Sequence, residues 1–196
     1  MSMILTRFIL IAIVFLGGCA TPKNAIYLDP AFHQKIDRTL YVLPAVDHRL
    51  DKSTSIDIDS DIRKPFSDQL RDKGYEIVLL NDFGGKESMP ATAVAEMSTD
   101  ELYALGPQQA KSVLLLYLDD VSSKYVIMGY TYKVEITGIL LDKHGKAILW
   151  KDKGVGSSGQ GGLISGLMAP LIKSTAIDIA VNNMVKSFPN KTNTTE

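Results

Sequence analysis

The stretch from Ser112 to Gly154 restricts the fold more than any other part of the sequence. It reads SVLLLYLDDVSSKYVIMGYTYKVEITGILLDKHGKAILWKDKG and predicts three strands in succession. Residues 143–146 predict a hairpin turn between the last two strands, and residues 120–124 predict the link between the first two. Alternating apolar positions along the middle strand predict one half-exposed face; they are Tyr130, Tyr132, Val134, Ile136 and Gly138. The chain must therefore contain an antiparallel meander.

Two runs before this block predict further strands. Thr39–Val46 is a β-branched and aromatic run closed by Pro44, and Tyr75–Leu80 is a second run of the same kind. The residues between them are long enough for a crossover helix. A strand, a helix and a strand in this order favour parallel pairing of the two strands.

The segment between these two strands predicts one amphipathic helix. Its apolar residues recur every four positions, at Ile58, Ile62, Phe66 and Leu70. Asp59 or Ser60 is suited to cap its start, and Gly74 is suited to follow its last turn. Pro65 lies inside this apolar pattern, and because proline disrupts a helix interior we expect it to kink the helix or to move its start.

Helices and a glycine-rich segment complete the pattern. Residues 98–105 predict a short helix capped by Ser98 or Thr99, and the glycine-rich residues 154–170 predict a flexible loop. A terminal helix follows, with a sheet-facing side at Ile172, Ala176, Ile179, Ala180, Asn183, Met184 and Ser187. These elements predict an α/β (α+β) fold, a single mixed sheet of about five strands with helices packed on it.

The first nineteen residues resemble a bacterial lipoprotein signal. A nine-residue apolar run, Phe8–Leu16, follows Arg7; it is too short to span a bilayer, which takes roughly 20 residues. Leu16-Gly17-Gly18-Cys19 resembles the lipobox, and Cys19 is the only cysteine in the chain. The resemblance implies cleavage between Gly18 and Cys19, then a diacylglycerol and an N-acyl chain such as palmitate on Cys19. A core cysteine or an ordinary secretory signal is the alternative.

These features divide the chain into four parts. Residues 1–18 are the expected signal peptide, and residues 19–38 are the expected lipidated cysteine and tether. Residues 39–188 are the expected single globular periplasmic domain, followed by a disordered tail at 189–196. By resemblance to lipoproteins, Ala20 in place of an Asp indicates the periplasmic face of the outer membrane.

Composition excludes a broad nucleic-acid surface. Without residues 1–18 the chain loses only Arg7, so 20 of its 21 Lys and Arg remain against 22 Asp and Glu. This near-balance leaves no general attraction for nucleic acid. With the only cysteine assigned to lipid, packing and not disulfides must stabilise the domain.

Candidate chemistry has a simpler explanation in each case. Gly154-x-Gly156-x-x-Gly159 matches a dinucleotide fingerprint in letters, but only one helix follows it. Asp57-x-Asp59-x-Asp61 resembles the start of a calcium loop without its glycine and glutamate, so helix capping is the better interpretation. No metal ligands, catalytic residues, cofactor beyond the lipid, or small-molecule substrate are expected; Asp47 with His48 is the one pair weighed as part of a triad.

Aromatic residues of the meander have two interpretations. Trp150 with Tyr125, Tyr130 and Tyr132 could form a recognition face for a ligand. Aromatics at every second position of an antiparallel sheet more often pack across strands, which is the favoured interpretation.

The order of elements resembles periplasmic lipoproteins with a fold like the amino-terminal domain of TolB. Three stretches carry the resemblance: LYVLPAV, LYALGPQQAKSVLLLYLDDVSSKY and GILLDKHGKAILWKDKG. They resemble in particular a small outer-membrane lipoprotein family of Neisseria and other proteobacteria. More distant relatives by fold are CsgG of curli secretion, PelC of polysaccharide export and LpoB, an activator of a penicillin-binding protein. The sequence shows no obvious long amphipathic hairpins of the kind with which CsgG builds a barrel.

The resemblance implies a non-enzymatic, lipid-anchored accessory or structural component of an envelope export or assembly system. It implies a homo-oligomer with the membrane, further copies and other envelope proteins as partners. The apolar residues of the glycine-rich segment are the expected contacts with a neighbouring subunit or a membrane, namely Leu163, Ile164, Leu167 and Met168. The alternatives are a loop folded over the domain's own core and, for function, a monomeric tethered module that regulates a periplasmic or inner-membrane enzyme.

Overall fold

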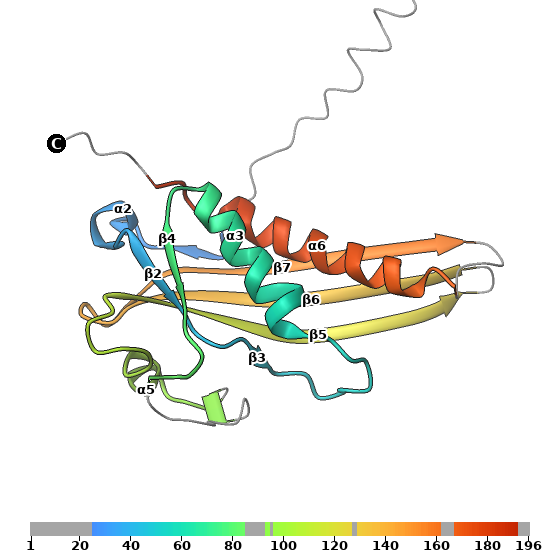
Figure 1. The fold of residues 1–196 in the computed structure, drawn as a ribbon, viewed down its shortest axis with the longest axis horizontal. Coiled ribbons are helices and arrows are strands. Elements are labelled where there is room, and N and C mark those ends of the chain that lie inside the picture. Colours follow the sequence, from blue (N-terminus) through green and yellow to red (C-terminus); the bar gives the residue numbers. More distant parts are fainter. Residues whose placement is uncertain (1–24, 85–92, 95, 127–128, 162–166, 192–196) are drawn as a thin grey trace, which may run out of the picture.

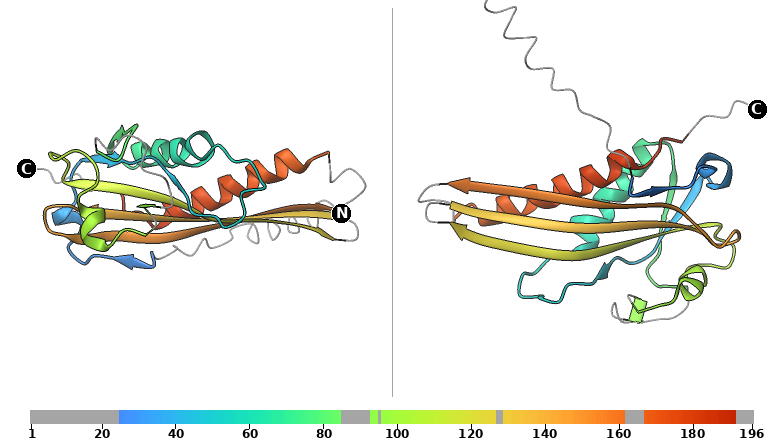
Figure 2. Two further views of the ribbon diagram at one scale, coloured as in Figure 1. Left: turned by 90° about the horizontal axis from the view of Figure 1, so that it is seen from below. Right: turned by 180° about the vertical axis from the view of Figure 1, so that it is seen from behind.

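The structure, a computed structural model, describes residues 25–84, 93–94, 96–126, 129–161 and 167–191. A twisted β-sheet forms the centre, and its three longest strands extend beyond the rest of the domain as an arm (Figure 1). Two helices lie on one face of this sheet (Figure 2).

Within the described residues the sheet has seven strands in the order β1-β7-β6-β5-β2-β4, with β3 beside β5. Pairing of β2 with β4 and β5 is parallel, and the β5-β6-β7 meander is antiparallel. The mixed α/β fold is thereby confirmed, with more strands than the expected five because β1 and β3 are two-residue strands. Their bounds are β1 Tyr27–Leu28, β2 Thr39–Val42, β3 Val46–Asp47, β4 Glu76–Leu79, β5 Ser112–Val126, β6 Gly129–Asp142 and β7 Ala147–Gly161.

Helical segments with both ends in the described parts of the chain accompany the sheet. They are α2 Phe32–Lys35, the π-helix η1 Asp59–Arg63, α3 Lys64–Asp72, α5 Thr99–Tyr103 and α6 Ala169–Ser187. The short α5 has the expected start: Ser98 and Glu101 form a reciprocal capping box. The parallel β2-α3-β4 unit also agrees with the sequence prediction.

Two hydrophobic cores lie on opposite faces of the sheet. Along β5, Leu114, Leu116 and Leu118 belong to the main core, which α3 and α6 cover. The alternate residues Val113, Leu115 and Tyr117 belong to the second core, which α5 helps to cover. Side chains alternate between the faces of a strand, so this apolar run is buried on both sides.

The predicted strand 39–46 is divided in the structure. β2 ends at Val42, and Val46 begins β3, which pairs with a different part of β5. Pro44 lies in the gap, where its missing N–H removes no ladder hydrogen bond.

Pro65 explains why the predicted helix begins irregularly. It lies in the first turn of α3, where a helix has no use for the missing N–H. The preceding turn is a π-helix, in which the Lys64 N–H donates to the Asp59 carbonyl. Neither Asp59 nor Ser60 caps it; instead Asp57 Oδ1 accepts the Ser60 N–H at 3.2 Å, which lowers the pKa of Asp57.

Residues 120–124 do not form the predicted link between strands. β5 continues through them to Val126, and a register shift between Leu118 and Asp120 accommodates Asp119 as a bulge. The turn at 143–146 is confirmed.

The buried face of α6 differs in part from the prediction. Ile172, Ala176, Ala180 and Met184 are buried as expected, whereas Ile177, Val181 and Val185 are buried in addition. Ile179, Asn183 and Ser187 are only half-buried. The reason is that α6 contacts α3 and η1 as well as the sheet, so its buried stripe is wider and displaced.

Residues 25–38 belong to the folded part and not to a free tether. Phe32 and Ile36 are buried in the main core, and the Phe32 ring lies 5.7 Å from that of Phe188, edge to face. At the other end, Lys191 N–H donates to the Lys73 carbonyl at 2.9 Å, so the beginning of the expected tail also contacts the domain.

Candidate interaction surface

The arm formed by β5, β6 and β7 is the most distinctive surface of the domain. On one outer side, β2 and β3 pair with β5 only as far as Leu118. On the other, β1 pairs with β7 only at Trp150 and Lys151. Within the described residues, both outer strands of the arm therefore present unpaired edges from these points to the tip.

The two edges are protected differently. The β5 edge carries a bulge and the charged side chains Asp119, Asp120 and Lys124, which hinder pairing with another strand. The β7 edge, residues 152–161, has the sequence DKGVGSSGQG, in which Asp152 is buried and Lys153 is the other charged residue. An edge of ten residues with so little protection is suited to bind an extended segment.

Two glycines bring α6 directly onto β7. A Cβ built on Gly154 would lie 2.1 Å from the Ala180 carbonyl oxygen, and one on Gly156 would lie 1.8 Å from that of Ala176. The predicted loop over residues 154–161 is therefore wrong, because these residues continue β7. The fingerprint letters have a packing role: they occupy a strand and not the turn that begins a nucleotide-binding helix.

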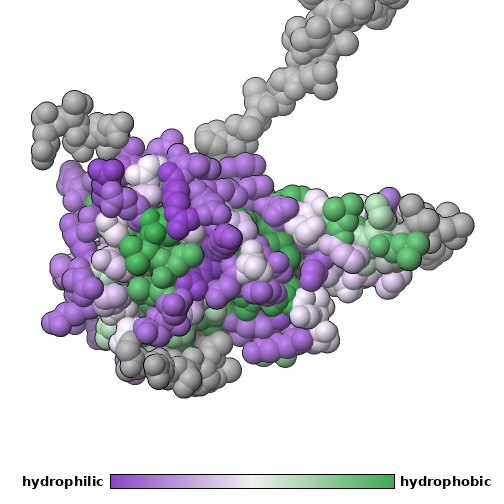
Figure 3. Space-filling view, in the orientation of Figure 1, coloured by the Kyte–Doolittle hydropathy of each residue, from purple (hydrophilic) through white to green (hydrophobic). Residues whose placement is uncertain are grey.

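Exposed apolar side chains lie toward the tip of the arm, at the start of α6 (Figure 3). Leu167 is 83% exposed and Leu171 is 57% exposed, whereas Met168 packs against the main core. Leu163 and Ile164 lie outside the described residues. Leu167, one of the residues expected to contact a subunit or a membrane, is thus exposed, and Leu171 is exposed beside it although the sequence analysis did not single it out.

A row of tyrosines lies along β5 and β6. Tyr125 and Tyr130 have ring centroids 5.0 Å apart, and Tyr130 and Tyr132 6.4 Å apart. Tyr132 is buried, which raises its pKa, while Tyr125 is 77% exposed. Trp150 is fully buried beside Phe66 and Phe188. The packing interpretation therefore holds for Trp150 and Tyr132, while Tyr125 is free to contact a partner.

The face of the arm opposite α6 carries an ionic network. Lys153 pairs with Glu135, and Lys133 lies 2.5 Å from the same carboxylate. Hydrogen bonds from Lys133 and Lys153 lower the pKa of Glu135. Thr137 Oγ1 donates to Asp119 at 2.5 Å. Each acidic group here already has a basic or hydroxyl partner, as in a structural network.

Asp47 and His48, the candidate pair for a catalytic triad, do not contact each other as a triad requires. Asp47 binds the Arg49 guanidinium through two hydrogen bonds of 2.8 Å, and His48 Nδ1 instead lies 3.8 Å from Asp119 Oδ1. His48 and Asp119 border a cavity of about 350 Å³ whose other walls are mainly apolar. Within the described parts of the chain, no three His, Cys, Asp or Glu side chains are placed to share a metal ion.

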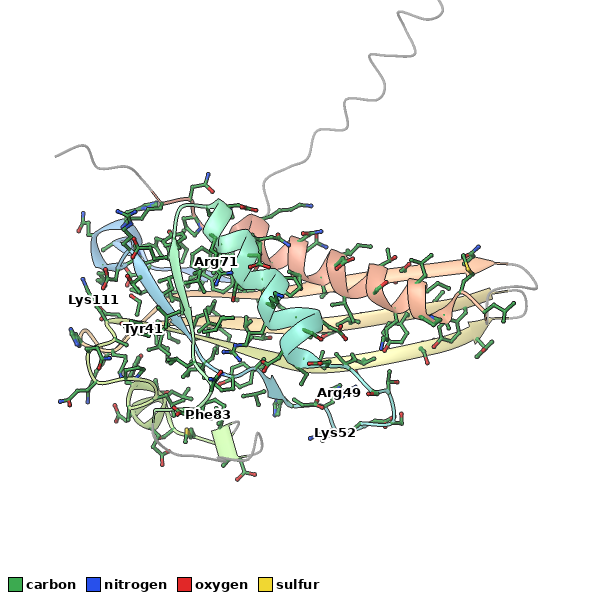
Figure 4. The ribbon with its side chains drawn as sticks, viewed as in Figure 1. Tyr41, Arg49, Lys52, Arg71, Phe83 and Lys111 are labelled. Atoms are coloured by element: carbon green, nitrogen blue, oxygen red, sulfur yellow. The ribbon has the colours of Figure 1, made fainter. Side chains whose placement is uncertain are left out.

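Arg49 closes the loop that follows β3, and Lys52 lies on the same loop (Figure 4). The Arg49 guanidinium also donates to the Thr54 carbonyl at 2.8 Å, and the Arg49 side chain is buried. Arg63 is buried in a similar way, donating to the carbonyls of Val42 and Leu80. The sequence gives no sign of either role, because both depend on contacts with distant or irregular backbone.

Solved structures similar to this chain include bacterial proteins described as lipoproteins. Lipoprotein GNA1162 from Neisseria meningitidis is 16% identical over 68% of this chain and 92% of its own, with a TM-score of 0.42. The PelC dodecamer from Paraburkholderia phytofirmans is 15% identical over 79% of this chain and 92% of its own, with a TM-score of 0.47. A minor lipoprotein from Acinetobacter baumannii is 9% identical over 76% and 90%, with a TM-score of 0.43.

These neighbours agree with the expected resemblance to lipoproteins, PelC among them. At such identities and TM-scores the likeness is distant and concerns the fold only. No protein-family model matches the chain, and no curated protein matches it.

Helices of the described parts are too short or too polar to cross a bilayer. Cys19 and Gly18, the expected lipidation and cleavage positions, lie outside the described residues.

Proposed function

We propose that this protein is a lipid-anchored, non-enzymatic component of an envelope export or assembly system, and that it acts as a homo-oligomer at the periplasmic face of the outer membrane. The lipid is attached to Cys19. The arm makes the contacts with neighbouring copies, through its exposed apolar residues. Other envelope proteins bind the assembled form.

The observation that carries the proposal is the exposed apolar pair Leu167 and Leu171 at the start of α6, toward the tip of the arm (Figure 3). Large apolar side chains that lie together on a surface mark contacts with a protein or a membrane. The charged network on the opposite face has its partners within the chain, so it offers less to a neighbour.

The short distance between anchor and domain supports assembly at the membrane. Residues 25–38 are folded against the domain, so only the residues from Cys19 to Ala25 separate the lipid from it. Six residues span at most about 20 Å when fully extended. A monomeric module that reaches an inner-membrane enzyme needs a much longer tether, which disfavours the alternative function.

The test is the oligomeric state of the full chain, extracted from membranes in detergent and measured by size-exclusion chromatography with light scattering. We expect a closed multimer. The double variant Leu167→Ser/Leu171→Ser should shift it toward monomer without loss of thermal stability, since both side chains are exposed. Asn182→Ser, an exposed change elsewhere on α6, is the control and should leave the multimer intact. A wild-type monomer would refute the oligomer.

A further inference from the structure

We infer that the folded domain rests on a phospholipid bilayer through its β1 edge, with Ile26, Tyr27 and Leu28 in contact with the headgroup region. This inference rests on the lipid anchor of the proposed function and adds to it the surface by which the domain meets the membrane. The contacts between copies proposed at the start of α6 are a separate site.

Three consecutive large side chains are exposed at this edge. The exposed fractions are 65% for Ile26, 44% for Tyr27 and 44% for Leu28. No other run of three large apolar side chains is exposed in the parts of the chain that the structure describes. Exposed apolar side chains that lie together mark a contact with a protein or a membrane.

The position of β1 allows one surface to meet these side chains together. β1 is the outermost strand, beside β7, and so borders an open side of the sheet (Figure 2). Tyr27 lies opposite Lys151, and Leu28 lies opposite Trp150. Side chains of consecutive residues alternate between the two faces of a strand, so Tyr27 and Leu28 project from opposite faces of the sheet. A surface laid against the edge meets both of them, whereas a partner on one face would meet only one.

The distance to the anchor favours a bilayer as the occupant of this edge. Ala25 packs against the main core, so the described chain starts at a fixed point of the domain. Six residue steps lead from Cys19 to Ala25, which reach at most about 20 Å when fully extended. The exposed run begins at the next residue, Ile26. With the acyl chains of Cys19 in the bilayer, the membrane surface therefore lies within this short distance of the run.

Lysine side chains beside Tyr27 suit a membrane interface. Lys151 lies opposite Tyr27, and Lys35 also lies near it. The pKa of Lys35 is raised mainly by its hydrogen bond to Asp29 and to a smaller extent by Tyr27. Tyrosine is enriched at the headgroup level of bilayers, and lysine can extend its ammonium group toward the phosphates while its methylenes cover apolar surface. Aliphatic, aromatic and basic side chains together therefore match the chemistry of a phospholipid surface.

The contact needs little affinity of its own, because the lipid already holds the domain at the membrane. Even one myristoyl chain binds a bilayer only marginally, so three partly exposed side chains would not retain a free domain there. A short linker, however, keeps its two ends at an effective concentration in the millimolar range. The anchored domain can therefore occupy a contact that an unanchored domain would not.

The consequence is a defined orientation of the domain. Because β1 pairs with β7, contact through the β1 edge sets this part of β7 along the membrane surface. The arm then extends sideways and not away from the bilayer. Its exposed Leu167 and Leu171 are thereby presented to copies anchored in the same leaflet.

The test is fluorescence quenching in the full lipidated chain, reconstituted into vesicles of phosphatidylethanolamine and phosphatidylglycerol that contain a lipid spin-labelled at its headgroup. Lipidation leaves Cys19 without a free thiol, so one introduced cysteine can carry a bimane fluorophore. We expect quenching at Tyr27→Cys and Leu28→Cys to be about three times stronger than at Leu50→Cys. Leu50 is a matched control, because it is a fully exposed apolar residue in the loop after β3. Equal quenching at the three positions would overturn the inference.

Flotation of the same vesicles separates this inference from the proposed function. Protein that floats but is quenched equally at all positions has its anchor and lacks the β1 contact. Protein that does not float refutes the anchor and the inference together. Rapid disulfide-linked dimers of Tyr27→Cys in native membranes would place a second copy at this edge, and so would overturn the bilayer as its occupant.

A double variant tests whether the side chains themselves make the contact. With bimane at Ile26→Cys, the change Tyr27→Ser/Leu28→Ser should reduce quenching to about half, because the apolar contact is lost while the anchor remains. Leu50→Ser is the control and should leave quenching unchanged. The melting temperature of each variant checks the fold and should match wild type, since the replaced side chains are exposed. Unchanged quenching in a folded double variant would contradict the inference.

Discussion

Gly156 of β7 lies so close beneath α6 that a methyl group on it would stand 1.8 Å from the carbonyl oxygen of Ala176. No side chain separates the helix from the strand at this point. The packing of α6 on the sheet therefore depends on a residue without a Cβ.

Gly156→Ala should destabilise the domain by about 1–3 kcal/mol or more, because the added methyl forces α6 away from the sheet. Chemical denaturation with urea measures the change. Ser157→Ala, the next residue on the exposed face of the same strand, is the control and should stay within about 0.5 kcal/mol of wild type. Equal stability of Gly156→Ala and wild type would mean that α6 does not lie where the structure places it.

Asp47→Asn should cost about 1–3 kcal/mol at pH 7, because it leaves the buried Arg49 guanidinium without its charged partner. Hydrogen bonds from Arg49 lower the pKa of Asp47, so the pair stabilises the fold above the unfolded pKa of about 3.9. This contribution is lost as the pH falls through the lowered folded value. The variant and wild type should therefore converge in stability once the pH is below the lowered folded pKa of Asp47. Asp72→Asn, an exposed change of equal charge, is the control and should stay within about 0.5 kcal/mol of wild type at pH 7.

Tyr117→Phe should make the protein less sensitive to alkali. Burial, with a smaller effect of Asp119, raises the pKa of Tyr117 to about 12. The phenol of the unfolded chain ionises near pH 10, so wild-type stability is complete below pH 10 and falls as the pH rises toward 12. Thermal unfolding at pH 8 and pH 11 measures this, and the drop in Tm should be smaller in the variant. Tyr125→Phe, at an exposed site, should behave as wild type.

Cys19→Ala should release the protein from the membrane fraction, because the acyl chains of a lipidated cysteine provide the attachment. Fractionation and intact mass measure this: the wild-type chain should begin at Cys19 with the added mass of a diacylglycerol and an N-acyl chain. Thr21→Ala should remain membrane-bound. A soluble wild-type protein would refute the anchor.

Local patterns were sufficient where neighbouring residues determine the structure. The turn at 143–146 and the cap at Ser98 follow from side chains within a few positions of one another. The parallel pairing of β2 with β4 follows from the order strand, helix, strand. The same is true of the fold class, because the meander and the crossover helix are both evident in hydrophobic periodicity.

Sequence patterns gave wrong predictions where a distant element determines the local structure. The glycines at 154–161 have the composition of a loop, yet they lie in a strand, and at Gly154 and Gly156 the carbonyls of α6, twenty or more residues later in the chain, explain why glycine is required. Polar residues at 120–124 similarly resemble a link, yet they continue a strand whose outward face is solvated. The exposure of Leu171 could not be predicted for the same reason, since it depends on how α6 lies on the sheet.

The edge-to-face contact of Phe32 with Phe188, together with the pairing of β1 with β7, joins the beginning of the domain to its end. Such contacts between residues far apart in sequence slow folding, because a long loop must close before they form. The main core cannot close until nearly the whole chain has been synthesised. The main core is therefore completed only once α6 and Phe188 are available to pack.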